Sequence, residues 1–252
     1  MIKFFRKIRQ QLLTENKFSK YLLYAIGEIF LVVIGILIAF SLNNWNQNRQ
    51  LMKEEVKVLK GLQNEMSENL IQFDEVYSNH IVKENGLKKI LFTDLENYNL
   101  DEFDAIEKSI IDSWTYNPSF SIYNTLVNSG KIETISTDSL KYRIAKYKDR
   151  VNDYLEEEII MKRNTRDHNW KYLVGQSAIS VKSRFGLSER NEQERKTDKN
   201  HYLNEFQSPQ FQNAIALLSI NMSHIISDGA ALREETLALI EILNLEIKKL
   251  DN

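Results

Sequence analysis

The longest apolar stretch of the chain is Tyr21–Leu42, and it contains a single carboxylate, Glu28. The hydrocarbon core of a bilayer is about 30 Å thick, so a helix that rises about 1.5 Å per residue needs roughly 20 apolar residues to cross it. Every residue of Ile29–Phe40 is apolar or Gly, which leaves no face of such a helix for water. This pattern predicts a transmembrane helix over residues 21–42.

The residues on the two sides of this stretch differ in charge. Residues 1–20 hold six Lys or Arg side chains and one acidic residue, a net charge of +5, whereas residues 43–48 carry no charge. Basic residues stay on the cytoplasmic side of a membrane. We therefore expect residues 1–20 inside the cell and residues 43–252 to be exported.

The basic segment, residues 1–20, also has an amphipathic pattern. Its apolar side chains recur about every 3.6 residues among the basic ones: Phe4, Phe5, Ile8 and Leu12. Such a helix lies on anionic lipid, so we predict a basic amphipathic cytoplasmic tail in contact with membrane lipid. An ordinary topogenic tail has the same charge, and this interpretation stays open. Cleavage of a signal peptide at residues 39–41 is a third interpretation, which Glu28 and the long basic segment disfavour.

Helix-favouring patterns continue beyond the predicted span. The whole chain contains two prolines and eight glycines, which leaves long uninterrupted stretches for helices. A heptad-like apolar stripe, interrupted by Asn69 and His80, consists of Leu59, Leu62, Met66, Phe73 and Val76. Because no Pro occurs in Tyr21–Phe92, we expect this helix to continue directly from the span.

Further helices are predicted along the rest of the chain. Residues 93–100 indicate a break, after which Asp101 caps a short helix that extends to Trp114. Asn117-Pro118 starts another short helix that ends at Asn128. An amphipathic helix from Leu140 is expected to continue to about Ser183.

The last part of the sequence alternates between a polar segment and an apolar stripe. Residues 186–200 contain one apolar side chain and predict a solvated loop. Ser208-Pro209 starts a final helix, with an interruption or kink expected at Asp228-Gly229. Three or four long helices with matching stripes favour an antiparallel bundle. The predicted fold is all-α: one N-terminal transmembrane helix followed by an elongated antiparallel helical bundle.

Residues 1–46 have the sequence MIKFFRKIRQQLLTENKFSKYLLYAIGEIFLVVIGILIAFSLNNWN. This stretch resembles the opening of the domain of unknown function 6090 family, single-pass membrane proteins of the Bacteroidota. Two later stretches, NPSFSIYNTLVNSGKIETI and SPQFQNAIALL, are similar to further signatures of that family. The resemblance supports the membrane topology and implies no activity. In a bacterial cell we therefore expect a single-pass inner-membrane protein whose C-terminal domain, residues 43–252, is periplasmic.

No motif of catalysis or metal binding is recognisable in the sequence. Its four histidines occur without Cys partners, an HExxH or GxSxG pattern, or a Gly-rich phosphate loop. His80 with Glu84 and His201 with Glu205 have a four-residue spacing that surface pairing explains better than a metal site. The acidic run of residues 156–158 is interpreted as a solvated face. We therefore predict no catalytic, cofactor-binding or metal-binding residues and no enzyme activity.

Four aromatic residues lie close together around Asn117-Pro118: Trp114, Tyr116, Phe120 and Tyr123. Aromatic rings with a polar group are favoured at interfaces, so these residues are candidates for a ligand cleft or a partner groove. The alternative is a structural corner in which large rings fill the gap between helices. The corner is the favoured interpretation, because Ser129-Gly130 indicates a tight turn nearby.

Glu28 is the most costly residue of the predicted span, because a charged carboxylate at membrane depth is unfavourable by a few kcal/mol. On a helix it shares a face with Val32, Gly35 and Ala39. Gly35 and Ala39 have the spacing of small residues that lets two helices approach closely. This face is therefore the candidate transmembrane docking face. A neutral Glu28, or one that reaches the interface, is the alternative.

These patterns favour a membrane-anchored, non-enzymatic interaction or scaffold protein. We expect its partner to be a second copy of the chain or another inner-membrane protein, without a cofactor. The alternative is a ligand-sensing or transport-accessory subunit that acts through a partner membrane protein. No basic stripe predicts a nucleic-acid partner, and the formal net charge of the chain is −2.

Overall fold

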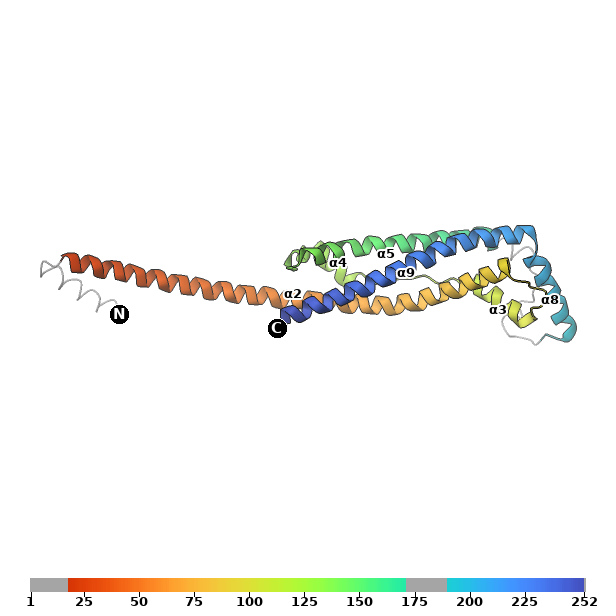
Figure 1. Ribbon diagram of the computed structural model, residues 1–252, viewed down its shortest axis with the longest axis horizontal. Coiled ribbons are helices and arrows are strands. Elements are labelled where there is room, and N and C mark those ends of the chain that lie inside the picture. Colours follow the sequence, from red (N-terminus) through yellow and green to blue (C-terminus); the bar gives the residue numbers. More distant parts are fainter. Residues whose placement is uncertain (1–17, 171–189, 252) are drawn as a thin grey trace. The chain divides into compact units, whose positions relative to one another are not determined.

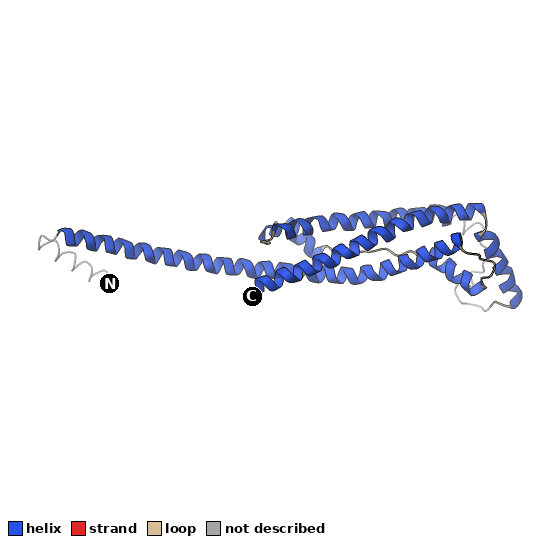
Figure 2. Ribbon diagram, in the orientation of Figure 1, coloured by secondary structure: helices blue, strands red, loops and turns tan. Residues whose placement is uncertain are grey.

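The computed structural model describes residues 18–170 and 190–251, and all their regular elements are helical (Figure 2). In chain order the elements are α2 (Phe18–Phe92), α3 (Leu100–Ile111), α4 (Ser121–Asn128), η1 (Lys131–Thr134), α5 (Asp138–Asn164), η2 (Thr165–Trp170), α8 (Glu192–Phe206) and α9 (Pro209–Asp251) (Figure 1). The predicted all-α class is confirmed. The chain divides into two compact units, Met1–Val56 and Lys57–Asn252, and α2 runs through both.

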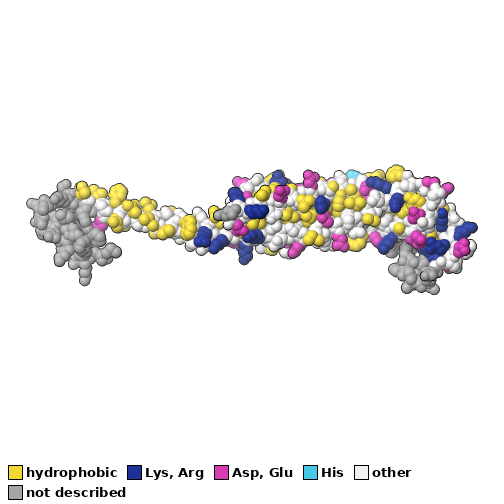
Figure 3. Space-filling model, turned by 60° about the horizontal axis from the view of Figure 1, so that its bottom comes forward, with side chains coloured by type: hydrophobic (Ala, Val, Ile, Leu, Met, Phe, Trp, Pro, Cys, Tyr) yellow, Lys and Arg dark blue, Asp and Glu magenta, His cyan; other side chains and the backbone are white. Residues whose placement is uncertain are grey.

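The first unit contains the most apolar part of α2. Residues 29–43 are all exposed, and Figure 3 shows hydrophobic side chains along this stretch. Among the described residues, two helices are long and apolar enough to cross a membrane: α2, from Ala25 onward, and α9. The most apolar window of α2 is 0% buried, whereas that of α9 is 33% buried. By length and composition, both helices are candidates for a membrane span.

The second unit is built on three long helices: the part of α2 that follows residue 56, together with α5 and α9. Four pairs of side chains show that α9 runs antiparallel to both others: Lys60 with Asp251, Asp74 with Arg233, Arg150 with Glu235, and Asn164 with Asn221. Figure 1 shows α5 and α9 side by side along most of their length. The predicted antiparallel arrangement of helices is therefore present in this unit.

Buried residues on these helices recur at alternating steps of three and four positions, which places them on one helix face. On α2 the buried residues that follow this spacing are Leu59, Leu62, Met66, Asn69, Phe73, Val76, His80, Lys83, Leu87 and Ile90. On α5 they are Leu140, Ile144, Tyr147, Val151, Tyr154, Glu158 and Met161. The stripe on α2 thus continues through Asn69 and His80, and polar residues occupy core positions on both helices.

The two short helices after α2 differ from their predicted bounds. Helix α3 ends at Ile111 instead of Trp114, and Asn99 caps it instead of Asp101: the Asn99 side chain accepts the Glu102 N–H and the Glu102 carboxylate accepts the Asn99 N–H. Helix α4 begins at Ser121 instead of Asn117-Pro118. The physical reason is that residues 112–120 hydrogen-bond to neighbouring helices and so do not extend either short helix.

Helix α5 covers the first part of the helix predicted from Leu140. Its α-helical part stops at Asn164, and a π-helical turn, η2, follows to Trp170. The predicted end near Ser183 lies outside the described residues.

The predicted loop over residues 186–200 is wrong from Glu192 onward. Helix α8 begins at Glu192, with Asn191 as the N-cap of a capping box. Its other end carries Tyr202 and Phe206, whose ring centroids lie 5.4 and 5.7 Å from that of Phe103 on α3. A polar helix is stable here because good capping at one end is combined with buried aromatic rings at the other.

Helix α9 is continuous through Asp228-Gly229, so the predicted interruption there is wrong. Gly229 is buried, and a Cβ atom at this position would lie 2.5 Å from Cε2 of Tyr77 and 3.1 Å from Cε2 of Tyr154. The Tyr77 hydroxyl donates to the Ile226 carbonyl oxygen at 2.9 Å, which holds the ring in place. Gly229 therefore permits close packing of α9 on α2.

We expect Gly229→Ala to lower the free energy of unfolding by about 1–2 kcal/mol, because the strain of moving Tyr77 exceeds the gain in helix propensity. Gly61→Ala on α2 is the matched control, since its Cβ would meet Ile122 at an ordinary 3.5 Å. The control is expected to raise stability by up to about 1 kcal/mol. Urea unfolding of the full chain in detergent measures both values; equal effects of the two changes would contradict the packing argument.

Candidate functional site

Residues 112–120, here called the connector, join α3 to α4 without helical structure. Only its two ends make helix-type bonds, from the Asp112 N–H to the Lys108 carbonyl and from the Asn124 N–H to the Phe120 carbonyl, so the backbone polar groups between them need partners from neighbouring elements. Side chains of α2 and α5 provide partners for four of its residues: Asn69, His80, Lys83 and Glu158 bond the backbone of the connector, and Glu65 accepts the Ser119 hydroxyl. All five side chains are buried.

Asn69 and Glu65 hold the end of the connector that leads into α4. The Asn69 amide donates to the Ser119 carbonyl oxygen at 2.7 Å and accepts the Ser119 N–H at 2.8 Å. The Glu65 carboxylate accepts the N–H groups of Ile122 and Tyr123 at 2.8 and 3.0 Å and the Ser119 hydroxyl at 3.0 Å. A side chain of α2 therefore does what an N-cap residue ordinarily does for α4.

His80 lies between the connector and α5, with 4% of its surface exposed. Its Nε2 is 3.2 Å from the Trp114 carbonyl oxygen, which only accepts, so Nε2 carries a proton. Its Nδ1 is 2.9 Å from the Tyr154 hydroxyl. In the neutral ring, Nδ1 therefore accepts the Tyr154 proton. Burial lowers the pKa of His80, which favours this neutral form.

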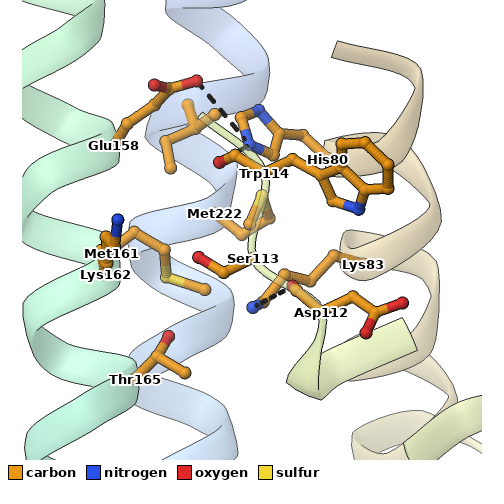
Figure 4. A pocket seen from close by; sticks show the side chains of 11 residues that line it. His80, Lys83, Asp112, Ser113, Trp114, Glu158, Met161, Lys162, Thr165 and Met222 are labelled. Carbon is orange, nitrogen blue, oxygen red and sulfur yellow. Dashed lines mark hydrogen bonds and ion pairs between the residues drawn. The ribbon is translucent and has the colours of Figure 1, made fainter. Parts of the chain in front are cut away.

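Glu158 lies beside His80 on the other side of the connector. Its carboxyl accepts the Tyr116 N–H, at 3.0 and 3.3 Å from the two oxygens, and its Oε1 is 3.7 Å from His80 Nε2 (Figure 4). Burial raises the pKa of Glu158 to about 7, although the hydrogen bond from the Tyr116 N–H acts in the opposite direction.

Lys83 holds the end of the connector that follows α3. Its ammonium group donates to the Asp112 carbonyl oxygen at 3.1 Å. Burial lowers the pKa of Lys83 to about 8, and the nearby Asp112 carboxylate offsets part of this effect. The buried face of α2 thus contributes Lys83 and His80 to the part of the connector that follows α3.

A small cleft lies between the connector, α2, α5 and α9, and Figure 4 shows His80, Lys83 and Glu158 around it. The cleft has room for about one water molecule. Helix α9 contributes the apolar side chains of Met222 and Ile225. Within residues 18–170 and 190–251, no three His, Cys, Asp or Glu side chains are placed to hold a metal ion. The chemistry that the described site offers is proton exchange between buried groups.

The four aromatic residues singled out in the sequence lie in three different surroundings. Trp114 is 41% exposed and lines the cleft, whereas Tyr116 is buried against Phe73, with ring centroids 5.2 Å apart. Phe120 and Tyr123 pack together at 5.7 Å, and the Lys148 ammonium lies over both rings. The structure therefore places one of the four at the cleft and uses the others in packing.

The residues of the candidate transmembrane docking face lie on the first part of α2. Glu28 is half-buried, and Val32 is 54% exposed. A Cβ atom at Gly35 would meet nothing within 4 Å, and Ala39 is exposed one helical turn further along. Within this unit the small residues therefore leave an open surface on the helix.

Two sequence-based interpretations of polar residues are wrong. His80 does not form a surface pair with Glu84, which pairs with Lys88 instead, and Glu158 is not on a solvated face. Both residues continue the three-and-four spacing of the apolar stripes on their helices, and this signal identifies them as core positions. The His201–Glu205 pair is present, with 3.9 Å between Nε2 and the carboxylate oxygen.

Together, the exposed apolar stretch of α2 and the bundle with its buried polar site define the class: an all-α protein with a candidate membrane helix. The family model described as Family of unknown function (DUF6090) matches residues 28–167, more than half of the chain. The chain belongs to this family, as its sequence predicts. The match includes Glu28, the connector and Glu158. No curated protein and no solved structure matches the chain.

Proposed function

We propose that this protein is a membrane-anchored, non-enzymatic interaction or scaffold protein with residues 21–42 as its single span. The observation that carries the proposal is a contrast within α2. Residues 29–42 are apolar apart from one serine and are exposed, whereas the apolar positions from Leu59 to Ile90 are buried. An exposed apolar surface that is long enough to cross a bilayer requires lipid or protein around it.

The other candidate span, α9, has a different explanation. Its apolar face contributes buried residues along its whole length, from Phe211 to Ile247, and it packs against α5 and α2. It also carries ionisable residues in its middle, among them Asp228 and Arg233, which are costly within a bilayer. A core helix of the bundle accounts for both features.

The orientation follows from charge. Residues 1–20 carry a net charge of +5, which favours the cytoplasmic side, while residues 43–48 are uncharged. The protein is then an inner-membrane protein whose residues 43–252 form a helical domain in the periplasm.

Its partner in the membrane is a second copy of the chain, which contacts the face formed by Glu28, Val32, Gly35 and Ala39. Support comes from the open space above Gly35 and from the one-turn spacing of Gly35 and Ala39, which allows two helices to approach closely. A second polar side chain opposite Glu28 would also reduce the cost of placing it in lipid.

Disulfide cross-linking in membranes tests this interface, because the chain contains no Cys. Copies of Ala39→Cys are expected to link on oxidation, whereas Leu37→Cys, on the opposite face of the helix, is expected to link several-fold less. Adding Gly35→Ile to Ala39→Cys should reduce its cross-link, since a branched side chain separates the helices. Equal cross-linking at positions 37 and 39 would contradict the proposed face.

A ligand-sensing or transport-accessory role through a partner membrane protein is the second candidate. The observation that favours it is the buried acid–base pair of His80 and Glu158, because perturbed pKa values cluster at functional sites. Detergent-extracted protein that shows no structural response to pH in the site would remove this support.

A further inference from the structure

The Arg49 guanidinium group lies over the indole ring of Trp45, with 5.6 Å between its Cζ atom and the ring centroid. Both residues are in the first unit, on the part of α2 that follows the apolar stretch. Trp45 is 62% exposed, and Arg49 is exposed too. Packing in a core therefore does not account for this contact.

The contact keeps the guanidinium near the end of the proposed span. Trp45 follows Leu42 by three residues, which places it about 5 Å further along the helix axis. Helical side chains lean toward the N-terminus of their helix, and this lean brings the Arg49 side chain back over Trp45. The headgroup layer is about 5–8 Å thick on each side of a bilayer. With residues 21–42 in the membrane, both groups lie at headgroup level.

The two side chains of this pair have different uses at that level. An indole ring is favoured at the membrane interface whatever the lipid, because it is apolar with one polar edge. A guanidinium group is more selective, since its planar fork of N–H donors matches the oxygens of a phosphate group. The contact with the Trp45 ring leaves the N–H donors at the edge of the Arg49 guanidinium available to an oxygen ligand.

The charge of the surrounding residues favours an anion. Residues 43–53 contain two cations, Arg49 and Lys53, with six Asn or Gln side chains and no Asp or Glu. Lys53 is exposed and lies one helical turn beyond Arg49, on the same side of α2. The nearest carboxylate before this segment is Glu28, and the nearest one after it is Glu54. The part of α2 that leaves the proposed span is therefore positively charged.

We propose that Trp45, Arg49 and Lys53 form a binding site for the phosphate group of an anionic phospholipid, in the leaflet on the C-terminal side of the span. The Trp45 ring holds the guanidinium at the level of the phosphate, the guanidinium donates hydrogen bonds to two phosphate oxygens, and Lys53 adds a second positive charge. This inference rests on the proposed span over residues 21–42 and specifies which lipid contacts it.

A lipid fits this site better than a soluble phosphate. Two exposed cations bind a small anion in water only weakly, because solvent and salt screen them. The acyl chains of a lipid already keep its phosphate at the level of the site, so its effective concentration there is high. A small number of contacts is then enough to select an anionic headgroup.

The lipid site is compatible with the proposed docking face. At 3.6 residues per turn, Trp45 lies about a quarter to a third of a turn around the helix from Gly35 and Ala39. A second copy that contacts Gly35 and Ala39 therefore leaves the Trp45 ring facing lipid. Each copy of the chain has its own lipid site.

Quenching of Trp45 fluorescence by brominated lipids tests the site. The full chain carries Trp114→Phe and Trp170→Phe, so that Trp45 is its one indole, and is reconstituted in phosphatidylcholine bilayers. A small fraction of the lipid is brominated near the headgroup and is either phosphatidylglycerol or phosphatidylcholine. Each basic side chain near a membrane surface favours anionic lipid about fivefold. We therefore expect brominated phosphatidylglycerol to bind beside Trp45 at least about fivefold more strongly than brominated phosphatidylcholine.

Three variants in this background test the assignment of residues. Arg49→Gln should reduce the preference for phosphatidylglycerol about fivefold, because it removes the cation that lies over the ring. Arg49→Lys keeps the charge without the planar fork and should retain only part of the preference. Lys57→Gln is the matched control: Lys57 is an exposed cation of α2, more than four helical turns past Leu42, and its removal should leave the preference unchanged.

The outcomes separate this site from the span on which it rests. Quenching of Trp45 by both lipids to the same extent would overturn the site and leave the span in place, whereas quenching by neither would overturn both. An Arg49→Gln variant that keeps the preference would also overturn the site, as would an Arg49→Lys variant identical to the natural protein. Displacement of phosphatidylglycerol by inorganic phosphate at constant ionic strength would show that the ligand is not a lipid.

Discussion

We expect the Glu65→Ala variant to lose about 3 kcal/mol of its free energy of unfolding. The Glu65 carboxylate accepts two backbone N–H groups at the start of α4, from Ile122 and Tyr123, and the hydroxyl of Ser119. Removing the carboxylate leaves these donors without their acceptor, which costs about 1–3 kcal/mol for each buried donor that stays unsatisfied. It also deletes the cap of α4. Phe120, the residue at the N-cap position, offers no side-chain replacement.

Two further variants separate the cap from a general effect of charge. Glu65→Gln keeps one carbonyl oxygen and is expected to lose about half as much stability as Glu65→Ala. Glu68→Ala removes an exposed carboxylate from the same helix and should change stability by less than about 0.5 kcal/mol. Urea unfolding followed by circular dichroism measures all three. A Glu65→Ala value no larger than that of Glu68→Ala would show that the contacts to α4 contribute little.

The second large effect is expected in the exposed apolar stretch of α2. Replacing both Val33 and Leu37 by Asp should move the protein from the membrane fraction to the soluble fraction. Each carboxylate near the centre of a span costs about 3 kcal/mol, so the pair shifts the insertion equilibrium by roughly 10⁴-fold. Both positions lie away from the Gly35 and Ala39 face, so the change does not act through the proposed docking face.

A matched pair of substitutions outside the span controls for added charge. Asn44→Asp with Asn48→Asp has the same four-residue spacing and should leave the protein resistant to extraction with alkaline carbonate. If the Val33 and Leu37 double variant also remains in the carbonate-resistant pellet, then α2 is not the membrane anchor and α9 becomes the stronger candidate.

The sequence predicts the long helices well, because the information is local. The stretch Tyr21–Phe92 contains no Pro, and α2 is continuous through it. The three-and-four spacing of apolar residues predicts the buried faces of α2 and α5, and it also includes His80 and Glu158. These two residues are misinterpreted when their polarity is given more weight than their position in the stripe.

The connector is not predictable in the same way, because its partners are distant in the chain. The Tyr116 N–H bonds Glu158, 42 residues away, and Ser119 bonds Asn69, 50 residues away. A local pattern such as Asn117-Pro118 indicates a helix start and contains no sign of these contacts.

The polar helix α8 illustrates a different limit. The sequence from Asn191 to Glu194 contains the capping box that starts the helix, so a local signal is present. Composition nevertheless favours a loop, because most of the helix buries little. The deciding contact is the packing of Tyr202 and Phe206 on Phe103, which depends on tertiary structure.

The central claim, that residues 21–42 cross the membrane with the following domain outside the cytoplasm, is tested most directly by cysteine labelling in intact cells. The chain has no Cys, so single substitutions on the two sides of the span, Ser19→Cys and Asn48→Cys, report their own location. With a maleimide that does not cross the inner membrane, we expect position 48 to be labelled in intact cells and position 19 only after lysis. Labelling of position 19 in intact cells, or protection of position 48, would contradict the proposed topology.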